Sequence, residues 1–145
     1  MNTLDIEKAK EIREAITAGE KALKSVEAAR RQLHSASNWG LVDIFGGGLL
    51  TDVIKHSKIS KANDLMTQMQ YDLKQFQKEL GDIQMEINYN IDISSTMYMF
   101  DILFDNVFAD VMVQGKINEA LNSVESLKLT IENIVKDLKT HLTKY

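Results

Sequence analysis

Two pairs of chemically active side chains stand four residues apart in this sequence. Asp52 precedes His56 by four residues, and Asp101 precedes Asp105 by the same step. Residues four apart lie on one face of an α-helix, and facing helices can supply carboxylate and imidazole ligands to a metal inside a bundle. These four residues are therefore our candidate ligands for a divalent metal, with a hydrolytic role as one use of it. The alternative for the first pair is an ordinary helix-surface pair or a capping aspartate.

Three consecutive glycines offer a second kind of site. Gly46, Gly47 and Gly48 stand shortly before a predicted helix that carries Lys55. Amides at a helix N-terminus attract anions, so these four residues are our candidate anion-binding group. The spacing does not match a P-loop, which needs Lys and Ser or Thr directly after its last glycine. We give more weight to the alternative, a structural turn that lets Trp39 and its apolar neighbours fold back onto the protein.

A nucleophilic catalytic centre has no support in the sequence. Ser57 adjoins His56, so the two side chains point to different sides of a helix. The chain has no cysteine, which excludes disulfides and thiolate ligands to zinc. We therefore expect a non-enzymatic protein without a resident cofactor, and a divalent metal stays the open alternative.

The elements that must position these residues are long amphipathic helices. Apolar residues recur at alternating steps of three and four over residues 3–36, 51–87 and 116–144, which predicts coiled-coil-like helices. The apolar stretch 95–113 predicts a shorter, largely buried helix, and residues 37–50 predict a glycine-rich loop. We expect one all-α domain over the 145 residues, an antiparallel bundle of three long helices plus the shorter one.

Charge and composition argue against several classes of protein. The net charge of −4 disfavours nucleic-acid binding, which needs a basic face. The stretch 95–113 is too acidic to span a membrane, and residues 1–18 do not resemble a signal peptide, so we expect a cytoplasmic protein. Residues 79–115 carry seven acids and no Lys or Arg. This acidic run either faces lysines within the fold, which we favour, or binds a basic partner.

Two motifs in the sequence resemble those of a known family. Residues 39–48 read W-G-x-x-D-x-F-G-G-G and are followed by Lys55-His56-Ser57, and residues 108–114 read F-A-D-x-M-V-Q. These motifs resemble an uncharacterised family of helical bacterial proteins, and the likeness extends over about residues 35–138. The resemblance implies one continuous helical domain and supplies no catalytic residue.

The long apolar seams favour a role in protein–protein interaction. They exceed what a compact globule needs, so our leading hypothesis is an interaction or scaffold protein that self-associates or binds a helical partner. The alternative is a small metal- or anion-binding protein, hydrolytic in one version, with its site near the glycine-rich loop. A third, weaker hypothesis is a membrane-active protein in which residues 41–50 or the 95–113 helix insert into a bilayer.

Overall fold

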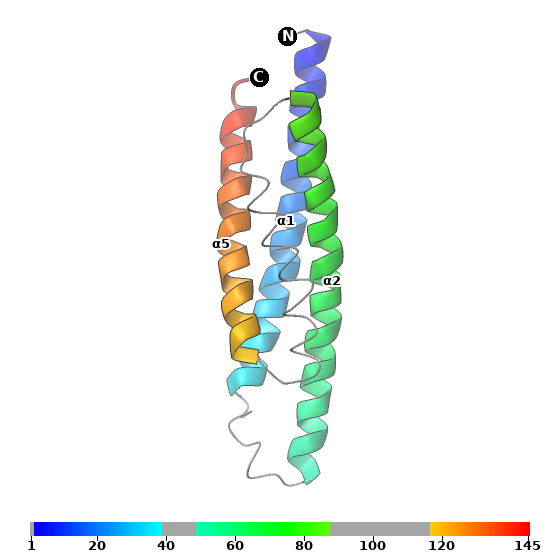
Figure 1. The fold of residues 1–145 in the computed structure, drawn as a ribbon, viewed down its shortest axis with the longest axis vertical. Helices are drawn as coiled ribbons and strands as arrows, with labels where there is room; N and C mark the ends of the chain where they lie inside the picture. The colour runs from blue at the N-terminus through cyan, green and yellow to red at the C-terminus, as the bar shows by residue number, and fades with distance from the viewer. Residues whose placement is uncertain (1, 39–48, 88–116) are drawn as a thin grey trace.

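Three α-helices make up the regular structure in the described part of the chain. The computed structural model describes residues 2–38, 49–87 and 117–145. Within these ranges the helices are α1 (Thr3–Asn38), α2 (Leu49–Ile87) and α5 (Ile117–Leu142), and no strand occurs (Figure 1). The predicted all-α class is therefore confirmed for these residues. None of the helices described has the length and apolar character needed to cross a bilayer.

Local hydrogen bonds define the first and last turns of the described chain. The side chain of Asn2 caps α1, because its Oδ1 accepts a hydrogen bond of 2.8 Å from the amide of Asp5. At the other end, α5 ends at Leu142, two residues before the predicted end. The amide of Lys144 then donates to the carbonyl of His141 at 3.1 Å, a tighter turn that closes the helix.

The helices on either side of the predicted glycine-rich loop extend into its assigned range 37–50. α1 continues to Asn38 and α2 begins at Leu49, directly after the last of the three glycines. Residues 37, 38, 49 and 50 are therefore helical. None of them is a proline, and the three glycines lie between the two pairs, so nothing in the sequence breaks a helix there. The rest of the predicted loop, residues 39–48, and the predicted helix 95–113 lie outside the described residues.

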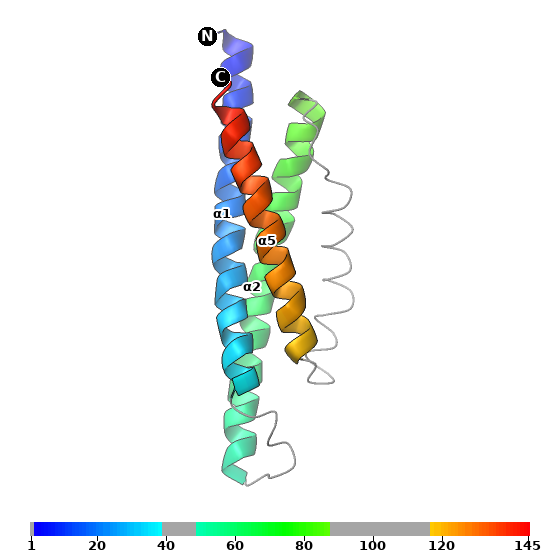
Figure 2. The ribbon, with the colours of Figure 1, turned by 90° about the vertical axis from the view of Figure 1, so that its left-hand side faces the viewer.

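α1 is the helix that joins the other two. It runs from the N-terminal end of the molecule, and α2 and α5 both run back toward that end (Figures 1 and 2). α1 packs along both of them. Contacts between side chains follow these directions: Ser25 of α1 reaches Asp72 of α2, and Glu20 of α1 pairs with Lys139 of α5.

One apolar core lies between the three helices. Its buried members are Ile12, Ala15, Ile16, Ala22, Val26, Ala29 and Leu33 of α1, Met66, Met69, Leu73, Phe76, Leu80 and Ile83 of α2, and Ala120, Val124, Leu127, Ile131, Ile134, Val135 and Leu138 of α5. On α2 these positions alternate strictly by three and four, which is the narrow seam of a coiled coil. α1 adds a second row of buried alanines seven residues apart, so its buried face is wide enough to meet two neighbours.

At Gly19, side chains of both α2 and α5 pack against the backbone of α1. A Cβ atom built on Gly19 would lie 2.6 Å from Cγ2 of Val135 and 2.9 Å from Cε1 of Phe76. Both distances are shorter than non-bonded carbon atoms tolerate. The absence of a side chain at this position is therefore what allows α2 and α5 to pack against α1 at the same level.

Candidate functional site

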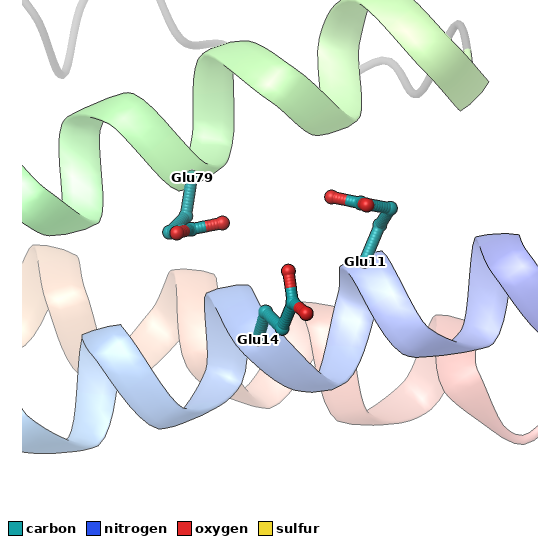
Figure 3. A group of neighbouring side chains, drawn as sticks. All are labelled: Glu11, Glu14 and Glu79. Atoms are coloured by element: carbon teal, nitrogen blue, oxygen red, sulfur yellow. The ribbon is translucent and has the colours of Figure 1, made fainter.

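Three glutamates from two helices meet at the α1–α2 interface. Glu11 and Glu14 lie three residues apart on one face of α1, and Glu79 points toward them from α2 (Figure 3). One carboxylate oxygen from each residue lies within 4.8 Å of the others. Because α1 and α2 run in opposite directions, residues so distant in sequence share one level of the interface. This acidic cluster is the candidate site in the described part of the chain.

The electrostatics of the acidic cluster disfavour the charged form of Glu79. Burial raises the pKa of Glu79 above its ordinary value, and the charges of Glu14 and Asp82 raise it further, against an opposing effect of Lys78. Glu14 has a cation nearby, since Nζ of Lys10 lies 3.9 Å from its carboxylate. A proton or a divalent cation would relieve the remaining repulsion, and carboxylate oxygens are the ligands that Ca²⁺ and Mg²⁺ prefer.

A shallow groove extends from the acidic cluster along the α1–α2 interface. Its lining residues are Lys10, Arg13, Glu14, Thr17, Ala18 and Lys21 of α1 and Tyr71, Asp72, Gln75 and Glu79 of α2. Three of these are cationic and three are acidic, so the groove does not select ligands of one charge. Tyr71, which is 57% exposed, adds apolar surface to the groove. The groove is therefore better matched to a ligand surface that carries charges of both signs than to a single small ion.

At the end of the groove away from the glutamates, a carboxylate is buried in the interface. Asp72 is only 2% exposed, and it is the only charged residue so deeply buried among those the structure describes. The Ser25 hydroxyl of α1 donates a hydrogen bond to it, the Gln68 amide donates another at 3.3 Å, and Nζ of Lys21 lies 3.8 Å away. These donors offset the cost of removing the carboxylate from water.

A second charged network links α1 to α5. The Arg30 guanidinium donates two hydrogen bonds to Glu27, at 2.8 and 3.0 Å, and Nζ of Lys128 on α5 lies 3.1 Å from the same carboxylate. Mainly through Arg30, these cations lower the pKa of Glu27 to about 2. Arg31 pairs with Glu27 as well, and Lys128 also approaches Glu132. Glu125 of α5 lies 3.9 Å from Arg30 and brings the network to three cations and three carboxylates, which is the character of a helix-packing contact.

The candidate residues nominated from the sequence lie elsewhere in the chain. Gly46, Gly47, Gly48, Asp101 and Asp105 fall outside the described residues. Asp52, Lys55 and His56 lie on α2, in its first turns, where the structure describes the course of the helix but not the side chains. Both the metal site and the anion site predicted from these residues therefore stay predictions.

Sequence reasoning did not nominate the acidic cluster or the buried aspartate. Glu11 and Glu14 resemble an ordinary solvated helix face, and Glu79 was noted only as the start of an acidic run. Their convergence depends on the alignment of α1 with α2, which no local pattern specifies. One feature of the sequence could have indicated that Asp72 is buried. It directly precedes Leu73, a residue of the apolar seam, and a charge at that place must either reach solvent or find partners.

Comparison of the chain with protein-family models, with curated proteins and with solved structures finds no match.

Proposed function

We propose that this protein is a helical-bundle interaction or scaffold protein that acts through self-association or by binding a helical partner. The observation that carries the proposal is the apolar start of α1. Leu4 and Ile6 are 57% and 53% exposed, although both belong to a helix whose later apolar residues are buried. The N-terminal end of α1 extends past the ends of α2 and α5 (Figure 1). When a second helix covers such exposed apolar side chains, the removal of their surface from water lowers the free energy of the assembly.

The lengths of the helices support the same proposal. α1 has 36 residues and α5 has 26, so α1 is longer by about 15 Å at the rise of an α-helix. α5 therefore cannot cover α1 along its whole length. We further propose that the complete chain forms an antiparallel bundle, with the 95–113 segment as a fourth, shorter helix, that it works in the cytoplasm, and that it belongs with the helical bacterial proteins whose motifs it resembles.

A pair of serine substitutions tests the role of the α1 start. The double variant Leu4→Ser/Ile6→Ser should lower the mass measured by light scattering over a concentration series, relative to the wild-type protein, because the apolar contact between copies is lost. The matched control is Leu129→Ser, which removes a leucine that is 62% exposed on α5. This control should leave the mass unchanged, and circular dichroism should show equal helix content in all three proteins.

Equal masses for the wild-type protein and the double variant at every concentration would remove self-association from the proposal. Binding of a helical partner would then have to be measured separately, with the partner added to each protein. Leu4→Ser/Ile6→Ser should weaken that binding, and Leu129→Ser should not.

The acidic cluster favours a second candidate function, binding of a divalent cation. Glu11, Glu14 and Glu79 supply oxygen ligands within 4.8 Å of one another, and Glu79 is partly buried. This site is distinct from the one that Asp52 and His56 would form with the two aspartates of the 95–113 segment. Either metal site would give the protein a metal-dependent role, and hydrolysis is one such role. The remaining form of this second function is anion binding at the glycine-rich loop.

Calorimetric titration with Ca²⁺, Mg²⁺ and Mn²⁺ separates these versions. Binding that Glu79→Gln abolishes and His56→Ala leaves intact assigns the metal to the acidic cluster, and the reverse result assigns it to the Asp52–His56 site. The exposed replacement Asp64→Asn controls for the loss of one negative charge. Absence of heat with all three metals would reject the metal form of this second function.

A further inference from the structure

The contact between Ser25 and Asp72 places a buried carboxylate beside the apolar core that α1 shares with α2. The hydroxyl of Ser25 on α1 donates to the carboxylate of Asp72 on α2, and Lys21 adds a cation at 3.8 Å. A buried polar pair of this kind contributes little net stability, because removing both groups from water offsets what their contact gains. Its value lies in specificity, since the contact forms in one alignment of the two helices only.

The seams of α1 and α2 repeat every seven residues and so do not specify one alignment by themselves. If α2 slid by one heptad toward the start of α1, Asp72 would face Ala18 and Glu14 in place of Ser25 and Lys21. That alignment removes both donors and adds a like charge. A slide in the opposite direction would place Asp72 against Ala28 and Gln32, which retains an amide donor and loses the cation.

The packing of Phe76 against Gly19 discriminates between the same alignments by shape. The ring of Phe76 occupies space that a Cβ on Gly19 would enter, since Cε1 lies 2.9 Å from that position. One heptad away in either direction along α1, the residue corresponding to Gly19 is Ile12 or Val26, and both are fully buried. A slide by one heptad would therefore drive the ring of Phe76 into a branched side chain, at a cost typical of overpacked cores.

We propose that the Ser25–Asp72 and Gly19–Phe76 contacts together form a register lock. The lock selects one alignment of α1 with α2 over alignments displaced by one heptad. This role lies beyond the proposed function, because it concerns the pairing of helices inside the chain and not the exposed start of α1.

Distance measurements between two spin labels test the register lock. The chain has no cysteine, so Thr17→Cys and Lys78→Cys attach labels at two exposed positions near the level of the Gly19–Phe76 contact. With an otherwise unchanged sequence, one narrow distance distribution is expected. In the variant Ser25→Ala/Asp72→Leu/Phe76→Leu, which removes both contacts, a second population should appear in which the labels are displaced along the helices by about 10 Å, one heptad at 1.5 Å per residue.

A control and a milder variant keep the test decisive. Asp64→Leu places the same apolar side chain at an exposed position of α2 and should leave the single distance unchanged. Replacing a buried polar pair by apolar residues is neutral or stabilising in many proteins, so the urea midpoint of Ser25→Ala/Asp72→Leu should not fall. If the triple variant does not fold, Ser25→Ala/Asp72→Leu is measured, and a smaller second population is expected. One unchanged distance in the folded triple variant overturns the proposal.

Discussion

At the scale of single residues, Gly19 is a position where the neighbouring side chains leave no room for a Cβ atom. It lies in the middle of a long helix, where glycine costs about 1 kcal/mol relative to alanine. That cost is offset by the close packing of Phe76 and Val135 against its backbone, at distances that leave no room for a methyl group. Both neighbours are buried, so neither can rotate away without opening a void elsewhere in the core.

Alanine substitutions at two glycines should therefore have opposite effects. We expect Gly19→Ala to lower the free energy of unfolding by about 1 to 3 kcal/mol, because a Cβ forces Phe76 and Val135 out of their packed positions. Gly81→Ala, on the open face of α2 with no atom within 4 Å of the added Cβ, should raise it by about 0.5 to 1 kcal/mol. Urea unfolding followed by circular dichroism measures both. A stabilised Gly19→Ala protein would show that the three helices do not meet at this residue.

The charge of Glu27 should make a pH-dependent contribution to stability. Its pKa falls from an ordinary 4.5 to about 2 in the folded protein, chiefly through the hydrogen bonds from Arg30. A lowered folded pKa stabilises the protein above pH 4.5, and this contribution is lost as the pH falls from 4.5 to about 2. Wild-type protein should thus exceed Glu27→Gln in stability by up to about 1 kcal/mol at pH 7, with the gap closing across that window.

Unfolding curves at several pH values between 7 and 2 check this expectation. The exposed replacement Glu7→Gln measures the general effect of removing one negative charge. A gap between wild type and Glu27→Gln that stays constant down to pH 2 would contradict the lowered pKa.

At the scale of elements, the helices were predictable because their signal is local. The alternating steps of three and four that run through Met66, Met69, Leu73 and Phe76 are visible in the sequence, and the same residues are buried on α2. The absence of proline likewise allowed long helices to be expected. Which residues face each other across two helices is not a local property, and it was not predicted.

The candidate sites illustrate that limit. The four-residue spacing of Asp52 and His56 suggested a site because spacing is what a sequence displays. Glu79 meets Glu11 and Glu14 only because α2 returns alongside α1 in one particular alignment. Asp72 is buried for the same reason, since Ser25 and Lys21 of α1 cover it. An acid on a helix gives no sign in the sequence of what the neighbouring helix brings to it.

Two leucines on α5 should separate the packed face of that helix from its outer face. Leu127 is fully buried, and replacing it by alanine should lower the free energy of unfolding by about 2 to 5 kcal/mol through lost contacts and a residual cavity. Leu129 is 62% exposed, and the same replacement there should change it by no more than about 0.5 kcal/mol. Thermal or urea unfolding of the two variants compares them directly. Similar losses for both would mean that α5 packs through a different face.

At the scale of the whole molecule, one apolar core holds the described helices together. α1 joins α2 and α5 through this core, and the charged contacts between α1 and α5 each pair a lysine or an arginine with a glutamate. The acidic cluster is the exception, and it is where a cation would act if the protein binds one. Against this background the exposed Leu4 and Ile6 at the start of α1 are the feature that most directly suggests contact with another helix.

The most direct test of this account is the distance between copies at the start of α1. A single spin label on Thr3→Cys leaves Leu4 and Ile6 in place, and a label on Asn133→Cys reports from an exposed position of α5. The account predicts strong dipolar coupling between copies for Thr3→Cys that grows with concentration, and weak coupling for Asn133→Cys. Coupling that is absent at Thr3→Cys, or equal at the two sites, would contradict self-association through the start of α1.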